Sequence, residues 1–422
     1  MPPLPAVLSD PLRTSPIVHR VLAGPGSGKT RLLIEEIRRR LETGLPPASI
    51  LGLTFTRKAA DEIKARLQPG HGPQAALPWV STLHKLAKRV QEDLLALPDQ
   101  IDPDRLIPEA TALLLRGTPP AWVPAIRFLG VDEAQDLDAS QVEFLQALRR
   151  HSPSAELLLV GDPDQAIFGF RQASSRYLLD ADTYFAAPVR TVILSTNHRS
   201  AQAIVTTARA ILAHVAHPDS PCRQLTAARP EAHPAVRTLS ADSPEDEAHR
   251  IFDELRTALA VGVPASECAI LVRTRAQIAP LRAEATRWGI PTYTPPVDDR
   301  LGETRRRSAP TSAITLLTIH QAKGCEWTVV FLAGCQAGLI PHEAARGSNE
   351  RDEERRLLYV AVTRAKQLLW LCRHGAPSPF LQDVPADADA FTIPLTDASR
   401  ASSDMRPAPS WLSRVCGWLT TR

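Results

Sequence analysis

Two short stretches, far apart in the chain, carry residue types that handle a nucleoside triphosphate. The first is Ala23-Gly-Pro-Gly-Ser-Gly-Lys-Thr30, which follows an apolar run and precedes a helical pattern. Its glycines let the backbone curl so that N–H groups point at phosphate oxygens, and the start of the next helix adds partial positive charge. Lys29 can reach the β- and γ-phosphates, and the Thr30 hydroxyl can ligate Mg²⁺. We therefore assign the whole loop to nucleotide binding: Ala23, Gly24, Pro25, Gly26, Ser27, Gly28, Lys29 and Thr30.

The second stretch is Val131-Asp-Glu-Ala-Gln-Asp136, at the end of another apolar run. Asp132 can hold Mg²⁺, and Glu133 is placed to orient and deprotonate an attacking water. An acidic pair after a strand, taken alone, is more often the solvated start of a helix. Together with the phosphate loop, it indicates hydrolysis of a nucleoside triphosphate.

Two arginines in the second half of the chain, Arg199 and Arg364, are candidates for stabilising charge on the transferred phosphoryl group. If a second domain supplies them, the nucleotide lies between two domains and hydrolysis can drive motion. The alternative is a pair of surface arginines in ordinary salt bridges, which is the commoner fate of a single arginine. Spacing alone leaves this alternative open.

These residues need elements to position them, and apolar runs alternate with helical patterns along the chain. Such alternation predicts parallel sheets covered by helices on both faces, in two α/β domains. We predict a leader at 1–16, an N-terminal domain at 17–192 with a small helical insert at about 88–126, a C-terminal domain at 193–382 and a tail at 383–422. The predicted strands are 18–23, 50–54, 127–132, 157–161, 191–195, 268–273, 314–319, 328–332 and 367–371, and the predicted helices of the first half are 31–42 and 58–67.

Composition narrows the class of protein. Of 422 residues, 44% are hydrophobic and 23% charged, which is ordinary for a globular protein of two or three domains. No apolar run is long enough to span a membrane and the N-terminus lacks signal-peptide order, so we predict a cytoplasmic protein. The six cysteines form no C-x-x-C pair, which favours buried reduced thiols. No coiled-coil heptads appear, so we expect a monomer. A net charge of +3 permits a nucleic-acid partner without arguing for one.

At this point the chain resembles superfamily 1 DNA helicases of the UvrD/Rep/PcrA type, over most of its length. Eight motifs occur in the family's order, which makes chance agreement negligible. The motifs are Ala23 to Thr30, Leu53 to Ala60, Ser81 to Ala87, Val131 to Asp136, Gly161 to Arg171, Asn197 to Ser200, Leu317 to Trp327 and Glu353 to Lys366.

The resemblance implies two RecA-like P-loop NTPase domains, with ATP and Mg²⁺ in the cleft between them. It implies that Gln165 senses the γ-phosphate, that Arg199 and Arg364 are arginine fingers, and that Glu326 approaches the ribose. For single-stranded DNA, or a junction of single and double strands, it implies base stacking by Phe55 and Phe170 and backbone contacts from Thr56, His84 and His320. Without the resemblance, the two phenylalanines would be interpreted as core residues and His84 as a surface or hydrogen-bonded histidine.

Two departures from the family bear on function. Residues 1–22 contain no Gln, whereas the family reads adenine with a glutamine before the phosphate loop, so the choice of ATP over other triphosphates stays open. Only about 40 residues separate Arg273 from Ile314, fewer than the roughly 50 that an independent domain needs. The chain therefore looks like a compact form without the large second insert.

The leading hypothesis is an ATP-dependent DNA helicase or translocase that moves 3′ to 5′ on single-stranded DNA, in DNA repair or replication. One alternative is a translocase that strips proteins from single strands with little unwinding, which the short insert favours. The other is a nucleotide-gated DNA-binding module without turnover. The intact set of Lys29, Thr30, Asp132, Glu133, Gln165, Arg199 and Arg364 argues against that last alternative.

Overall fold

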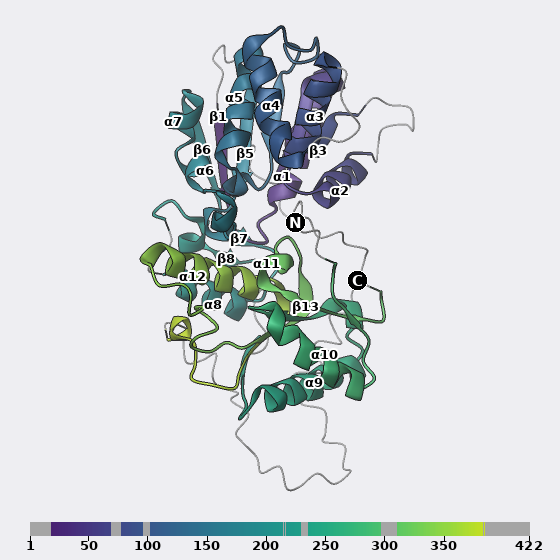
Figure 1. Ribbon diagram of the computed structural model, residues 1–422, viewed down its shortest axis with the longest axis vertical. Coiled ribbons are helices and arrows are strands. Elements are labelled where there is room, and N and C mark those ends of the chain that lie inside the picture. The colour runs from purple at the N-terminus through teal and green to yellow at the C-terminus, as the bar shows by residue number, and fades with distance from the viewer. Residues whose placement is uncertain are drawn as a thin grey trace. The chain divides into compact units, whose positions relative to one another are not determined.

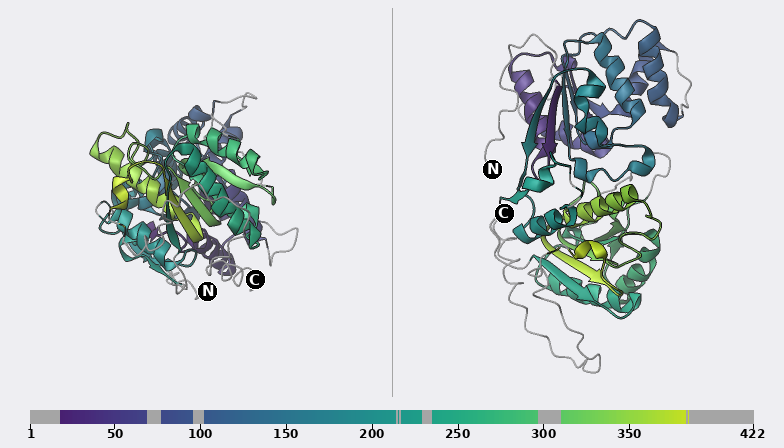
Figure 2. Two further views of the ribbon diagram at one scale, coloured as in Figure 1. Left: turned by 90° about the horizontal axis from the view of Figure 1, so that it is seen from below. Right: turned by 90° about the vertical axis from the view of Figure 1, so that its left-hand side faces the viewer.

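The computed structural model describes residues 18–68, 77–95, 102–213, 215, 217–228, 235–296, 310–382 and 384 (Figures 1 and 2). The chain divides into two compact units. Unit 1 comprises Met1–Ser195 and His217–Pro221, and unit 2 comprises Thr196–Ala216 and Cys222–Arg422. The predicted leader at 1–16 and the predicted tail at 383–422, apart from residue 384, lie outside the described residues.

Unit 1 is built on a six-stranded sheet with the order β3-β2-β4-β5-β1-β6, and every neighbouring pair is parallel. This confirms the parallel architecture predicted from the sequence. The strand β3, which lies at one edge, had no sequence prediction. The strands are β1 (Val18–Ala23), β2 (Ile50–Thr54), β3 (Trp79–Thr82), β4 (Phe128–Val131), β5 (Glu156–Gly161) and β6 (Val189–Leu194).

Helices cover both faces of the unit 1 sheet, because alternate residues of its central strands are apolar on both sides. Leu157 and Leu159 of β5 join one buried cluster with helices α3 to α7, whereas Leu158 and Val160 join another with α1 and α2. The helices are α1 (Lys29–Glu42), α2 (Arg57–Leu67), α3 (Leu83–Leu94), α4 (Pro103–Arg116), α5 (Ala139–His151), α6 (Arg176–Leu179) and α7 (Ala181–Phe185).

Short polar side chains fix where several of these helices begin. Asp138 accepts a hydrogen bond from the backbone N–H of Gln141, whose own side chain accepts from the N–H of Asp138, and this capping box starts α5. Thr56 and Thr82 cap α2 and α3 with their hydroxyls, which accept hydrogen bonds from the amides of Ala59 and Lys85. Each capped start follows closely on the carboxyl end of a strand, which is the edge where the candidate site residues lie.

Unit 2 holds a second six-stranded parallel sheet, with the order β11-β12-β10-β13-β14-β9, and a two-stranded pair β7-β8. The buried cluster of α9 and α10 packs on one face, and α8 and α12 contact each other and β14 (Figure 1). The elements are β7 (Thr196–Asn197), α8 (Gln202–Leu212), β8 (Thr226–Ala227), β9 (Val236–Ser240), α9 (Pro244–Ala260), β10 (Cys268–Val272), α10 (Ile278–Arg287), β11 (Thr292–Tyr293), β12 (Ile314–Thr318), α11 (Ile319–Ala322), β13 (Trp327–Ala333), α12 (Ser348–Val362) and β14 (Ala365–Arg373).

The stretch between β10 and β12 is the place where the sequence predicts that the large second insert is missing. Its described residues contain the 3-10 turn Arg275–Gln277, the single helix α10 and the two-residue strand β11. None of the helices in the described part of the chain is both long and apolar enough to cross a bilayer. The described cysteines are free and buried, which confirms the prediction of buried thiols for Cys222, Cys268, Cys325, Cys335 and Cys372.

Candidate active site

The phosphate loop joins β1 to α1 and adopts a backbone that only glycine accommodates without strain. Gly26 and Gly28 have φ values of +67° and +95°, in the left-handed region that side chains disfavour. Gly28 is the N-cap of α1, so the first free amides of the helix belong to the loop. The Ser27 hydroxyl donates to the Gly24 carbonyl at 2.7 Å, and the Gly24 amide donates to Leu194 of β6 at 2.9 Å. These bonds hold the loop open at the end of β1.

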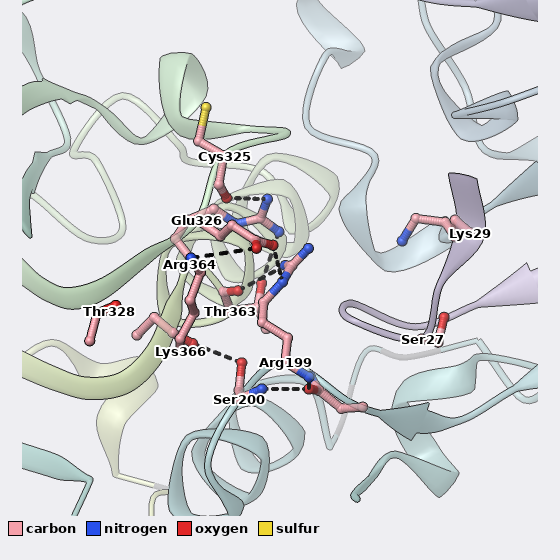
Figure 3. Close-up of polar contacts among 12 residues, drawn as sticks. Ser27, Lys29, Arg199, Ser200, Cys325, Glu326, Thr328, Thr363, Arg364 and Lys366 are labelled. Carbon is pink, nitrogen blue, oxygen red and sulfur yellow. Dashed lines mark hydrogen bonds and ion pairs between the residues drawn. The ribbon is translucent and has the colours of Figure 1, made fainter. Parts of the chain in front are cut away.

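Lys29 folds back over this loop. Its Nζ donates to the carbonyls of Ala23 and Gly24, at 3.1 and 3.4 Å, and Figure 3 shows its side chain beside the loop that carries Ser27. The ammonium charge also acts on Asp132 and Asp162, where it opposes the effect of burial on the carboxyl pKa. Lys29 therefore lies within electrostatic reach of both carboxylates at the ends of β4 and β5.

Thr30 and Asp132 meet at the carboxyl end of the sheet. The Thr30 hydroxyl donates to Asp132 Oδ2 at 2.9 Å, and the Asp132 amide donates to Leu53 of β2 at 2.8 Å. Burial and the neighbouring Glu133 raise the pKa of Asp132 to about 7, against the hydrogen bond from Thr30 and the charge of Lys29. A carboxylate in this setting is favoured by a nearby cation.

The donor set fits Mg²⁺. One carboxylate and one hydroxyl beside a phosphate loop are hard oxygen ligands, and Mg²⁺ is usually held by one or two carboxylates with phosphates and waters. Across the described ranges no group of three or more His, Cys, Asp or Glu side chains is arranged to hold a metal ion. Thr30 and Asp132 would supply two of the ligands of such an ion, and phosphate oxygens and waters would supply the others.

A glycine in β4 sets the approach of α1 to that strand. A Cβ placed on Gly130 would lie 2.4 Å from Leu33 Cδ1 and 3.0 Å from the Phe128 ring. Because a side chain at this position would push α1 away, Gly130 lets Thr30 at the start of α1 reach Asp132 at the end of β4. We therefore expect the contact between the two motifs to depend on this close packing.

Glu133 has an unusual backbone. Its φ of +54° and ψ of +38° place it in the left-handed region, which is uncommon for a residue other than glycine. Its amide donates to Asp132 Oδ1 at 3.0 Å, and its Oε2 accepts from Gln135 Nε2 at 2.5 Å. Such conformations persist where the surroundings fix them, and they concentrate at functional sites.

A buried hydrogen-bond network links Glu133 to Gln165. Gln135 Oε1 accepts from the Asp162 amide at 2.9 Å, and Gln165 Nε2 donates to Asp162 Oδ2 at 2.7 Å. Gly161 makes room for it, since a Cβ there would lie 2.5 Å from Gln135 Oε1. Sequence reasoning did not assign Gln135 and Asp162 to the site, although both stand within its motifs, because the sequence does not show that β4 and β5 place them together.

Three phenylalanines line up beyond this network. Phe55, which follows β2, stacks on Phe168 with a centroid separation of 6.0 Å and an interplanar angle of 12°. Phe168 meets Phe170 edge to face, also at 6.0 Å, and Arg171 lies over the rings of both. Phe170 is 66% exposed, so it is not a core residue. Phe168 was missed from the sequence, although its aromatic type within the motif was a signal.

Thr56, His84 and His320 each lie close behind the carboxyl end of a strand: β2, β3 and β12 respectively. In the structure the Thr56 hydroxyl accepts from the Ala59 amide at 3.2 Å and caps α2. His84, the second residue of α3, is half-buried, and burial lowers its pKa. His320 is the second residue of α11 and is also half-buried. Their roles as DNA-backbone contacts stay predictions.

In unit 2, three cations surround Glu326 (Figure 3). Arg199 Nε lies 2.5 Å from Glu326 Oε2, and Lys366 Nζ lies 3.7 Å from Glu326 Oε1. Burial alone would raise the pKa of Glu326, but the charges of Arg199, Lys366 and Arg364 outweigh it and lower the pKa. Lys366 is the last residue of the final motif, and the sequence predicts no role for it. Its Nζ also lies 3.2 Å from Glu267 Oε2.

Arg364 is not a surface arginine. Only 2% of it is exposed, and its Nε and Nη1 donate to the carbonyls of Val360 and Cys325 at 2.9 and 3.2 Å. Arg199 is more open, with 23% of its side chain exposed, and its Nη1 donates to the Thr363 carbonyl at 3.3 Å. The structure thus brings Arg199, Glu326 and Arg364 together within unit 2, as it brings Lys29, Thr30, Asp132, Glu133 and Gln165 together within unit 1.

Two protein families match the chain, one over each of its two units. The family described as UvrD/REP helicase N-terminal domain matches residues 11–111 and 92–186. The family described as UvrD-like helicase C-terminal domain matches residues 192–295 and 299–375. Both matches span the motifs that form the two clusters.

Individual relatives share between 25% and 28% of their aligned residues with this chain. A probable DNA helicase of Mycoplasma pneumoniae is 28% identical over 291 residues, which cover 68% of this chain and 51% of the relative. UvrD2, an ATP-dependent DNA helicase of Mycobacterium bovis, is 27% identical over 364 residues, covering 63% and 51%. PcrA, an ATP-dependent DNA helicase of Staphylococcus epidermidis, is 25% identical over 367 residues, covering 67% and 49%.

The chain spans about half the length of these relatives. Within that span, the two family matches together extend from residue 11 to residue 375, and each falls on a parallel α/β unit of the RecA-like P-loop type. The chain therefore belongs to the UvrD/PcrA-like helicases of superfamily 1.

Proposed function

We propose that the protein hydrolyses ATP and uses the energy to move along single-stranded DNA in the 3′ to 5′ direction, with helicase activity. The observation that carries this proposal is the stretch from Asp162 to Arg171. At one end, Gln165 shares a buried hydrogen-bond network with Glu133, and at the other, Phe170 is 66% exposed beside Phe168. A structural change at the nucleotide site can therefore be transmitted along this stretch to an aromatic surface that suits the stacking of DNA bases.

Residues of unit 1 would carry out the hydrolysis. The amides of the phosphate loop and Lys29 bind the phosphates, and Glu133 accepts the proton of the water that attacks the γ-phosphorus. As the new P–O bond forms, the bond to the β-phosphate oxygen breaks and ADP leaves. Thr30 and Asp132 would hold Mg²⁺, which neutralises charge on the β- and γ-phosphate oxygens when bound.

Residues of unit 2 would stabilise charge and read the nucleotide. Arg199 and Arg364 are proposed to stabilise the negative charge of the transferred phosphoryl group. Glu326, kept ionised by its three neighbouring cations, is proposed to accept hydrogen bonds from the ribose. Arg199 must exchange its ion pair with Glu326 for phosphate oxygens, and its 23% exposed side chain is free to do so more easily than the buried Arg364.

Residues that follow the carboxyl ends of the strands would hold the DNA. A motor that accepts any sequence should stack on base faces and bind phosphates, because every base has a π-face. Phe55, Phe168 and Phe170 are proposed to stack, with Thr56, His84 and His320 at the backbone. We further propose a monomeric, cytoplasmic protein with a role in DNA repair or replication and a preference for ATP.

The short stretch between β10 and β12 supports a second candidate. Its described residues form one helix, α10, and its length of about 40 residues is below the roughly 50 that an independent duplex-engaging domain needs. The protein would then translocate and strip bound proteins from single strands, while unwinding poorly. Both candidates share the same ATPase site and differ only in the work that translocation performs.

The test is steady-state ATP hydrolysis without nucleic acid, with single-stranded DNA and with single-stranded RNA, using Lys29→Ala as the blank. Strong stimulation by DNA is expected, and Glu133→Gln should bind ATP and DNA yet lose turnover. Absence of stimulation despite DNA binding would refute the motor and favour a nucleotide-gated binding module. Duplexes with 3′ or 5′ tails, and release of streptavidin from a biotinylated strand, then separate unwinding, direction and stripping.

A further inference from the structure

The path of the chain between the units contains a short return. After Ser195 the chain enters unit 2, where it forms β7 and α8, and then it comes back to unit 1 for the five residues His217–Pro221. From Cys222 it continues in unit 2. We call His217–Pro221 the return segment. The stretches before and after it both belong to unit 2. The return segment is therefore a place where the chain of unit 2 is attached to unit 1.

The anchor is a buried polar contact. The hydroxyl of Ser220 donates to the carboxylate of Asp164, and each residue is only 2% exposed. A hydrogen bond is stronger in a buried site, where water does not compete for its donor and acceptor. Within the return segment, Ser220 is further fixed by its amide, which donates to the His217 carbonyl at 2.8 Å.

Asp164 stands next to Gln165 and shares its network. Its amide donates to Asp162 Oδ1 at 3.1 Å, while Gln165 donates to the other oxygen of the same carboxylate at 2.7 Å. The Asp162 amide in turn donates to Gln135, which donates to Glu133 at 2.5 Å. A continuous series of hydrogen bonds therefore runs from Ser220 to the carboxylate proposed to activate water.

None of these intermediate side chains has much freedom. Gln135, Asp162, Asp164 and Gln165 are between 0 and 3% exposed, and Gly161 is so close that a methyl group there would collide with Gln135. In a packed interior, the displacement of one member is passed to the next, because there is no space to absorb it. The position of the return segment is thus tied to the geometry of Glu133 and Gln165.

We infer that Ser220 and Asp164 are positioning residues for hydrolysis, through which the return segment holds Gln165 and Glu133 in their active arrangement. The segment thereby connects the ATPase site of unit 1 to the two stretches of unit 2 that flank it. This inference rests on the proposed ATP hydrolysis. It assigns no contact with ATP to either residue, and so predicts an effect on turnover rather than on nucleotide affinity.

The experiment compares Ser220→Ala with wild type in steady-state ATP hydrolysis, in Mg²⁺ and saturating oligo-dT. We expect kcat to fall about tenfold, the lower end of what removal of an outer partner of a site costs, with KM for ATP within about twofold. Ser220→Thr, which keeps the hydroxyl, should restore most of kcat. In an Asp164→Ala background, Ser220→Ala should lower kcat no further.

The matched control is Ser152→Ala, at another buried serine of unit 1. Ser152 is the C-cap of α5, and its hydroxyl donates to the Leu148 carbonyl at 2.8 Å, outside the network. Thermal unfolding of each variant identifies any that fail to fold. If folded Ser220→Ala keeps wild-type kcat, or loses no more than Ser152→Ala, the inference is wrong while the ATPase stands. If wild type itself does not hydrolyse ATP, the proposed function fails instead.

Discussion

Substitution of Gly130 by alanine tests whether the packing of α1 on β4 sets the active-site geometry. The added Cβ would lie 2.4 Å from Leu33 Cδ1 and 3.0 and 3.2 Å from two atoms of the Phe128 ring, where ordinary contacts begin at 3.4 Å. Leu33 and Phe128 are both completely buried. Leu33 must therefore retreat by about 1 Å, and overpacking of this kind typically costs about 1–3 kcal/mol.

The displacement of Leu33 should also alter the geometry of the active site. Thr30 lies one helical turn before Leu33 on α1, and its hydroxyl is 2.9 Å from Asp132 Oδ2. A displacement of about 1 Å at a catalytic arrangement can lower the rate by as much as about a hundredfold. We therefore expect Gly130→Ala to lower both the stability of β4 and kcat for ATP hydrolysis.

Hydrogen exchange followed by mass spectrometry reports the local free energy of opening for β4 and α1, and ATPase assays report kcat. Leu33→Val removes the colliding methyl group, so the double variant should recover part of both losses. Gly117→Ala is the matched control, since a Cβ there would meet only the Leu113 carbonyl, at 3.4 Å. Unchanged exchange and kcat in folded Gly130→Ala would refute the argument that close packing joins the two motifs.

Three further predictions concern DNA binding, a buried ion pair and pH. Phe170→Ala and Phe168→Ala should each weaken binding of oligo-dT by about 1–3 kcal/mol, measured by fluorescence anisotropy, because each removes a stacking surface. Arg273→Ala should lower the free energy of unfolding of unit 2 by about 3–5 kcal/mol in denaturant titrations, since it leaves the 8% exposed Glu354 carboxylate without its bidentate partner. Burial lowers the pKa of His19 from 6.5 to about 4, so the folded state resists a proton that the unfolded state takes up. The free energy of unfolding is therefore unaffected by His19 above pH 6.5 and decreases by about 3 kcal/mol as the pH drops to 4. The His19→Gln variant should not show this decrease.

Each of these has a control and a contrary outcome. Ile193→Ala removes another exposed apolar side chain and should leave DNA affinity unchanged. An equal loss in Ile193→Ala would show that the phenylalanines are not specific contacts. Arg256→Ala breaks an exposed pair with Asp253 and should cost less than about 1 kcal/mol. Equal costs for the two arginines would contradict the burial argument, and identical pH profiles for wild type and His19→Gln would contradict the assignment to His19.

The fold class could be predicted from the sequence because each central strand is a short apolar run followed by a turn. All nine predicted strands are present, and helices predicted at 31–42 and 58–67 occur as α1 and α2. The strands that sequence reasoning passed over lie at sheet edges or are very short: β3, β7, β8, β9 and β11. Edge strands bury less surface, so their apolar pattern is weaker.

The candidate site likewise has one part that the sequence predicts and another that only the structure shows. The chemistry of Lys29, Thr30, Asp132 and Glu133 follows from residue type and spacing, because phosphate and Mg²⁺ binding demand those groups after a strand. The sequence also placed Phe170 in a motif, but only the structure shows that it is exposed and that Phe168 joins it.

What only the tertiary structure decided is which side chains meet. Gln135 and Asp162 stand 27 positions apart, yet β4 and β5 are neighbours in the sheet and bring them within 2.9 Å. Ser220 and Asp164 are 56 positions apart, and their contact exists because the chain returns from unit 2 to unit 1. Sequence by itself determined the groups available for chemistry through local pattern. Their pairing depends on strand order and on the path of the chain, which no local pattern encodes.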